Sequence, residues 1–171
     1  MVRLCTGTLF RSEAQVVVNA VNCVGVMSKG LALMFKRQYP AMYNDYVERC
    51  DQGRVQVGVP YIFDITTDRR VINLPLKYHW LSPMTLDAIR GGLDAIYRQH
   101  NVWEITSLAV PPLGSTDGHP WQVIGPLLYD GLSRFDCPTE LYAPLGVPDE
   151  HITPQYLAAQ AALANASASQ G

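Results

Sequence analysis

The chain has 171 residues, of which 48% are hydrophobic and 16% are charged. These proportions suit one domain with its own core, and no change of composition marks a boundary within residues 1–171. The formal net charge of −2 excludes a protein that coats nucleic acid through charge alone, because such binding depends on many basic residues.

Apolar runs along the chain predict strands that alternate with helices. Strands are expected at Val2–Leu9, Gln15–Val21, Val57–Asp64, Val71–Leu76, Ile105–Val110 and Thr139–Ala143. Several of these runs are apolar throughout, as expected for strands that are buried on both faces of a sheet. The first two strands are close in sequence and could form an antiparallel pair.

The segments between the strands place apolar residues at three- and four-residue spacing, which predicts helices. One helix begins at Gly30. Another lies in SPMTLDAIRGGLDAIYRQ, with Ser82 as its N-cap and Pro83 at its first position. A third begins near Pro120, and Pro126 is expected to disturb its middle.

An alanine- and serine-rich tail follows the last predicted strand. It is expected to form a helix from Pro154 that frays from about residue 158. Strands alternating with helices predict a three-layer α/β/α sandwich with a mixed, largely parallel sheet.

Two strand–loop–helix segments share one design. In VVVNAVNCVGVMSKG a strand ends, residues 22–29 form a loop, and Gly30 begins a helix; LAVPPLGSTDGHPW repeats this order. Ligands gather at the carboxyl ends of such strands, and helix N-termini favour phosphate. The segments predict a cleft for a diphosphate, although two ordinary strand–helix turns would explain them about equally well.

The motifs VVNAVNCVGVMSKGLALMFKRQYP, INLPLKYHW and VPPLGSTDGHPW occur in this order, and together they resemble the macrodomain family, which binds ADP-ribose. The resemblance covers Val2 to Ala143. It is strongest to the branch that contains the DarG antitoxins, which remove ADP-ribose from DNA bases, and the human terminal ADP-ribose protein glycohydrolase.

The resemblance implies a role for each matching residue. Lys77 matches the catalytic lysine and Asp117 the acid that assists it. Asn22 matches the residue that meets the distal ribose, and Tyr142 an aromatic residue beside the adenine. The remaining ligand-binding positions are Thr8, Leu9, Gly25, Val26, Met27, Ser28, Lys29, Gly30, Leu113, Gly114, Ser115, Thr116 and Gly118.

The sequence departs from the family pattern at three places. Gly7-Thr8-Leu9 stands where relatives have Gly-Asp-Leu, so recognition of the adenine amino group weakens or moves to another residue. Ser28 replaces a glycine, and the second loop lacks a common Gly-Cys-Gly and is one residue shorter. From the residues alone, Lys77 could be a surface lysine and Asp117 a turn-forming residue.

The resulting hypothesis is a metal-independent ADP-ribosyl glycohydrolase without a cofactor. Its substrate would be mono-ADP-ribose on a DNA base, thymidine above all, with acidic protein side chains as a second class. The alternatives are a non-catalytic ADP-ribose reader and an antitoxin that grips a toxin. Four scattered cysteines without a CxxC pair, and the lack of a signal-peptide pattern, predict a cytoplasmic protein with no metal site and no membrane contact. A monomer is expected as well. His119 is expected to be an exposed loop residue.

Overall fold

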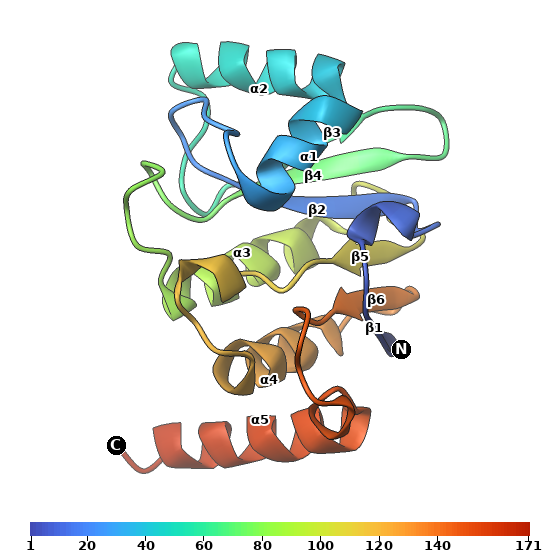
Figure 1. Cartoon of the computed structure of the whole chain (residues 1–171), viewed down its shortest axis with the longest axis vertical. Helices are drawn as coiled ribbons and strands as arrows, with labels where there is room; N and C mark the ends of the chain where they lie inside the picture. The colour runs from blue at the N-terminus through green and yellow to red at the C-terminus, as the bar shows by residue number, and fades with distance from the viewer.

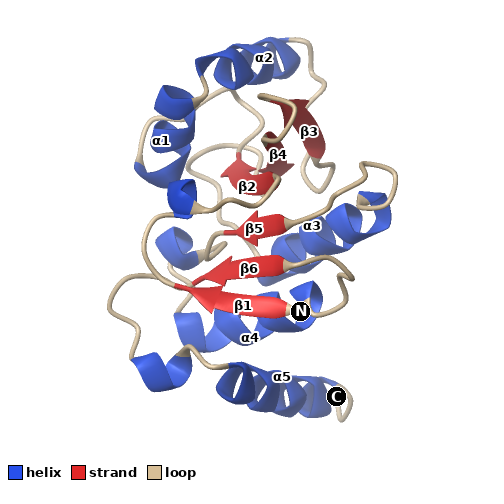
Figure 2. Ribbon diagram, turned by 90° about the vertical axis from the view of Figure 1, so that its right-hand side faces the viewer, coloured by secondary structure: helices blue, strands red, loops and turns tan.

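A six-stranded sheet forms the centre of the computed structural model, which describes all 171 residues. The sheet order is β1-β6-β5-β2-β4-β3. The strands are β1 (Val2–Cys5), β2 (Val16–Val21), β3 (Tyr61–Asp64), β4 (Arg70–Pro75), β5 (Leu108–Val110) and β6 (Thr139–Tyr142). All neighbours are parallel except β3, which runs antiparallel to β4. The arrowheads of β1, β6 and β5 in Figure 2 accordingly meet at one edge.

Helices cover both faces of the sheet, which confirms the predicted three-layer sandwich. They are α1 (Gly30–Gln38), α2 (Pro40–Asp51), α3 (Leu86–Gln99), α4 (Trp121–Leu132) and α5 (Pro154–Ala168). In Figure 1, α1 and α2 lie on one side of the sheet, α3 and α4 lie on the other, and α5 packs outside α4. None of these helices combines the length and the apolar composition that crossing a membrane requires.

The central strand β2 shows why the sheet is buried on both faces. Val16 and Val18 belong to a core cluster of 23 buried residues shared with α3 and α4. Val17 and Val21 point the other way, into a cluster of 13 buried residues beneath α1 and α2. Both sets of side chains lose their contact with water, so the strand is valine-rich rather than alternating.

The predicted antiparallel pair of the first two strands is wrong. β1 pairs with β6 in parallel at one edge of the sheet, whereas β2 lies between β5 and β4. The first strand also ends earlier than predicted, at Cys5. Gly7, at φ 92°, turns the chain, and the 3₁₀ helix Leu9–Arg11 then carries it across the sheet instead of back along β1.

Two helix details also differ from expectation. The N-cap of α3 is Thr85, whose hydroxyl accepts a hydrogen bond from Ala88 N at 3.1 Å. Ser82, the predicted cap, instead accepts a hydrogen bond from His79 N. Pro126 does not interrupt α4, which is continuous through it.

Strands β3 and β5 begin later than predicted, at Tyr61 and Leu108.

Candidate functional site

The predicted site residues all follow the carboxyl ends of parallel strands, along one edge of the sheet. Thr8 follows β1, Tyr142 ends β6, residues 113–118 follow β5, residues 22–30 follow β2, and Lys77 follows β4. The order assigned from the sequence, from adenine through diphosphate to distal ribose and lysine, is therefore also the spatial order of the strands. At the usual strand spacing of about 4.8 Å, the row from β1 to β4 spans roughly 19 Å.

Lys77 and Asp117 meet at the β4 end of this row. The lysine Nζ lies 2.6 Å from Asp117 Oδ1, and their side chains are only 16% and 17% exposed. The two residues come from strands on either side of β2, so the ion pair spans the end of that strand. A charged pair so largely withdrawn from water is held by electrostatics stronger than those of a surface pair.

Backbone hydrogen bonds fix the position of Lys77. Leu76 N donates to Val21 O at 3.1 Å, and Cys23 N donates to Tyr78 O at 2.8 Å, so the pairing of β2 with β4 continues past both strands. The Cys23 thiol also lies 3.7 Å from Lys77 O. The first loop and the lysine segment are thereby joined through their main chains. Burial raises the pKa of the Cys23 thiol, which disfavours a nucleophilic role for it.

Asp117 sits in a short 3₁₀ helix bounded by two glycines in the left-handed region. Gly114 has φ 90° and Gly118 has φ 87°. His119 is not the exposed residue that the sequence predicted: its side chain is partly buried, and Nε2 contacts Met84 O just before α3. This contact ties the Asp117 loop to the segment that follows Lys77.

The side chain of Asn22 holds the first loop through hydrogen bonds to its backbone. Its Oδ1 accepts hydrogen bonds from Val24 N at 3.0 Å and Val26 N at 3.3 Å, and its Nδ2 donates to Val26 O at 2.8 Å. The residue is 6% exposed. These bonds use one N–H of the amide, and the second N–H is the donor that remains for a sugar hydroxyl. The predicted ribose contact stays a prediction.

Tyr46 on α2 supports Asn22 and was not found by sequence reasoning. Its hydroxyl lies 2.8 Å from Asn22 Oδ1 and 2.9 Å from Asn22 O, and the side chain is fully buried. Burial raises the pKa of this phenol, so it remains a donor. In the sequence, Tyr46 is only one of several apolar positions at helical spacing, and nothing there distinguishes it from a core residue.

Each of the two loops buries one large apolar side chain. Met27 is 2% exposed and packs in the core, whereas Ser28, Lys29 and Gly30 are exposed. Leu113 is likewise a core side chain at 2% exposure.

The helices that follow these loops lack a side-chain cap at their N-termini. The helices α1 and α4 have no side-chain cap, and neither has α2, whereas Thr85 and Thr153 cap α3 and α5. Uncapped N–H groups at α1 and α4 are suited to an anion.

The far end of the row, where the adenine was predicted, is built around Glu140. Thr8 is exposed there, Leu9 is buried, and Tyr142 is 7% exposed with its hydroxyl donating to Glu140 Oε2 at 3.1 Å. Burial and this carboxylate raise the pKa of Tyr142 to about 12. Ser12 donates to the same carboxylate oxygen at 2.7 Å.

Burial alone would raise the pKa of Glu140, but three donors outweigh it. Hydrogen bonds from Ser12, Arg3 and Tyr142 hold the pKa of this carboxyl below its ordinary value. Sequence reasoning did not identify Glu140, because a glutamate in a short strand gives no signal of its partners. Three protein groups therefore already donate to this carboxylate, and the predicted recognition of the adenine at this end stays a prediction.

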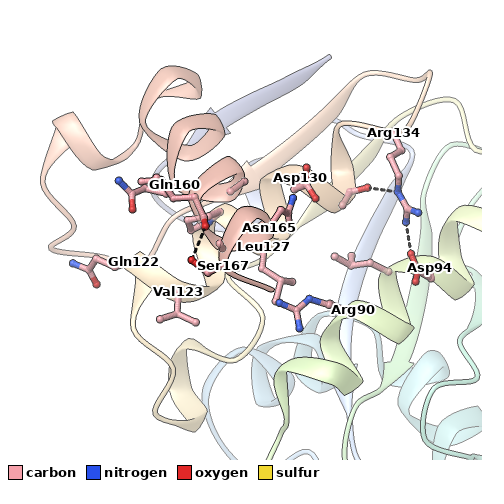
Figure 3. Close-up of a pocket in the computed structure, with 16 residues that line it drawn as sticks. Arg90, Asp94, Gln122, Val123, Leu127, Asp130, Arg134, Gln160, Asn165 and Ser167 are labelled. Atoms are coloured by element: carbon pink, nitrogen blue, oxygen red, sulfur yellow. Dashed lines mark hydrogen bonds and ion pairs between the residues drawn. The ribbon is translucent and has the colours of Figure 1, made fainter. Parts of the chain in front are cut away.

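A surface groove lies away from this row of residues. A groove of about 470 Å³ runs between α3, α4 and α5, lined by residues that include Arg90, Asp94, Val123, Asp130 and Arg134. Figure 3 shows Arg134 paired with Asp94 across it. None of the predicted site residues lines this groove. The predicted cleft at the carboxyl edge stays a prediction.

Comparison with known proteins identifies relatives. A sequence model of the Macro domain matches residues 18–123. A DNA ADP-ribosyl glycohydrolase of Mycobacterium tuberculosis is 37% identical over 151 residues, and one of Thermus aquaticus is 33% identical over 156 residues. These alignments cover 85% and 88% of this chain but 43% of each relative. The chain therefore spans less than half the length of these relatives.

Solved structures agree with the sequence comparison. The macrodomain of Mycobacterium tuberculosis DarG superposes with a TM-score of 0.80 at 38% identity, covering 84% of this chain and 98% of that one. Thermosipho africanus DarTG in complex with ADP-ribose gives a TM-score of 0.82 at 30% identity, covering 90% of this chain and 45% of that one. The chain belongs to the Macro domain family and is homologous to the DarG-type DNA ADP-ribosyl glycohydrolases.

Proposed function

We propose that the chain is an ADP-ribosyl glycohydrolase that removes mono-ADP-ribose from DNA bases, thymidine above all. The observation that carries the proposal is the Lys77–Asp117 pair, which stands at the sugar end of the row of predicted ligand residues. The names of the relatives support it, because they describe DNA ADP-ribosyl glycohydrolases. An ADP-ribose complex of a DarTG relative supports the same ligand.

The proposed chemistry uses Lys77 as the nucleophile. Its amine attacks C1 of the distal ribose while the bond from C1 to the base breaks. The attack needs an amine without its extra proton, and Asp117 at 2.6 Å is placed to take that proton and pass it to the departing base. Water then adds at C1 and frees both the lysine and ADP-ribose.

The other site residues would bind rather than react. Asn22 would hold the distal ribose through its remaining N–H, and its position is fixed by Tyr46. Backbone N–H groups at the starts of α1 and α4 would receive the diphosphate. Acidic protein side chains are a second class of acceptor, because the same attack at C1 would release a carboxylate.

A substrate panel tests the proposal. Purified protein is incubated with ADP-ribosylated single-stranded DNA, with glutamate-modified protein and with O-acetyl-ADP-ribose, and released ADP-ribose is measured. We expect release from the DNA, and loss of that release in Lys77→Ala. Lys36→Ala is the matched control, because Lys36 packs over the Tyr43 ring on the neighbouring helix. ADP-ribose binding without release from any substrate would show a reader module instead of an enzyme.

A further inference from the structure

Three exposed apolar side chains follow Lys77 directly. Tyr78 is 66% exposed, Trp80 is 43% exposed and Leu81 is 72% exposed. Large apolar side chains gathered at the surface are unusual away from binding sites, and two of these three are aromatic rings. In Figure 1 the segment that carries them is the green loop between β4 and α3, which projects from the carboxyl edge of the sheet.

This segment is ordered at both ends and in its middle. Leu76 and Met84 anchor it in the core at 1% and 5% exposure. Between them Ser82 N donates to His79 O at 2.9 Å, and Leu81 N donates to His79 Nδ1 at 3.1 Å. The side chains are therefore displayed on a fixed turn, which reduces the entropy that binding has to remove.

The ring of Trp80 also lies close to that of His79. Their centroids are 5.1 Å apart with an interplanar angle of 31°. The imidazole thus restrains the indole, which keeps part of its surface open to solvent. Residues 78–81, YHWL, carry no Lys, Arg, Asp or Glu. Whatever binds here meets aromatic and aliphatic surface rather than charge.

We propose that Tyr78 and Trp80 form a stacking platform for the bases that flank the modified base in single-stranded DNA. The inference rests on the proposed function and names the form of its substrate. A base whose sugar adduct reaches Lys77 has to leave the base stack, so its neighbours lose stacking partners. Tyr78 is the residue next to Lys77, and exposed aromatic rings replace stacking partners for any base.

The net charge of the protein bears on how a DNA strand would be held. With a net charge of −2, the chain lacks the excess of basic residues through which most proteins bind DNA phosphates. Stacking is the other general source of affinity for single strands. Binding of an ADP-ribosylated oligonucleotide should therefore depend weakly on salt. Raising salt from about 50 to about 200 mM should lower the ratio of oligonucleotide affinity to ADP-ribose affinity no more than about threefold. This is the loss expected from one neutralised phosphate.

The test compares an ADP-ribosylated thymidine oligonucleotide of about five nucleotides with free ADP-ribose. Affinities for both are measured by fluorescence anisotropy in a Lys77→Ala background, so that no turnover occurs. Adding Trp80→Ala or Tyr78→Ala should lower the ratio of oligonucleotide affinity to ADP-ribose affinity about tenfold. Tyr78→Phe should keep the ratio, because the ring is retained. Val102→Ala is the matched control, since Val102 is 76% exposed but precedes β5 at the opposite edge.

The same variants in the active protein give a second readout, the ratio of kcat/KM for the oligonucleotide to kcat/KM for ADP-ribosylated thymidine alone. This ratio should fall in parallel. An unchanged affinity ratio in both alanine variants overturns the platform. That result is the one expected if the exposed side chains bind a protein partner instead of DNA. If the wild type binds but cleaves neither substrate, the glycohydrolase proposal fails, while the affinity ratio still decides whether the platform exists.

Discussion

Lys77 and Asp117 are 40 residues apart in the sequence and follow two strands that do not pair with each other, β4 and β5, yet Nζ and Oδ1 are 2.6 Å apart. The pair bridges the end of β2, above the loop that contains Asn22. Each partner is held by its own loop, Lys77 by the extended pairing of β2 with β4 and Asp117 by the two left-handed glycines. The arrangement places an amine and a proton acceptor on one side of the predicted sugar position.

Replacing Asp117 should impair the chemical step more than binding. Asp117→Asn keeps the shape of the side chain but cannot accept the lysine proton, so kcat should fall by about two to four powers of ten with little change in KM. The measurement is steady-state release of ADP-ribose from modified DNA. Asp130→Asn, on the exposed side of α4, serves as the control. Full activity of Asp117→Asn would exclude the assigned proton transfer.

Removing the hydroxyl of Tyr46 should loosen the first loop. In Tyr46→Phe, Asn22 loses a buried donor, and we expect a loss of about 1–2 kcal/mol in the free energy of unfolding. Affinity for ADP-ribose should also fall, because the amide of Asn22 is less well oriented. Urea denaturation and calorimetric titration measure the two effects. Tyr43→Phe is the control on the same helix, since the Tyr43 hydroxyl makes no hydrogen bond within the protein.

The two glycines beside Asp117 should differ in their response to alanine. Gly118→Ala meets no atom within 4 Å, so it adds only the strain of a left-handed residue, about 1–2 kcal/mol. Gly114→Ala carries similar strain, and its Cβ would also lie 2.9 Å from Ile89 Cδ1 and 3.2 Å from the His119 ring. Gly114→Ala should therefore lower the thermal midpoint more. Equal shifts of the two midpoints would contradict this account.

Glu140 should make the protein sensitive to acid. Its pKa is lower in the folded protein than its ordinary value of 4.5, so the unfolded chain binds the proton first as the pH falls. Glu140 thus contributes stability above about pH 4.5 that is lost as the pH drops through the folded pKa. Urea midpoints of wild type and Glu140→Gln should differ most at neutral pH and converge as the pH falls below 4.5 and through the lowered pKa of Glu140. Glu13→Gln, at an exposed position, should show no such convergence.

Periodicity predicted the layers of the fold because burial on both faces leaves a clear apolar pattern in β2 and β4. The apolar periodicity could not show which strand pairs with β1. Pairing at a sheet edge depends on which distant strand arrives there, and β6 is more than 130 residues away in the sequence. Thr85 was missed as a cap because Ser82 and Pro83 offer an equally good local signal, whereas in the structure Ser82 belongs to a turn with His79 that precedes the helix.

The motifs led to Lys77 and Asp117, and the fold brings the two residues together. They could not reveal Tyr46 or Glu140, whose importance lies in hydrogen bonds between elements far apart in the sequence. A tyrosine inside an amphipathic helix and a glutamate inside a short strand look ordinary until their partners are known. The supporting residues of a site are therefore harder to read from sequence than its reactive ones.

The hydrogen bond from Cys23 N to Tyr78 O joins the sugar-side loop to the lysine segment entirely through main-chain atoms. Mutation can change either side chain during evolution without touching the link itself. The separation between Lys77 and its neighbouring loop is thus set by the topology of the sheet. Homologues with different side chains in this region are expected to keep the same distance between the lysine segment and the first loop.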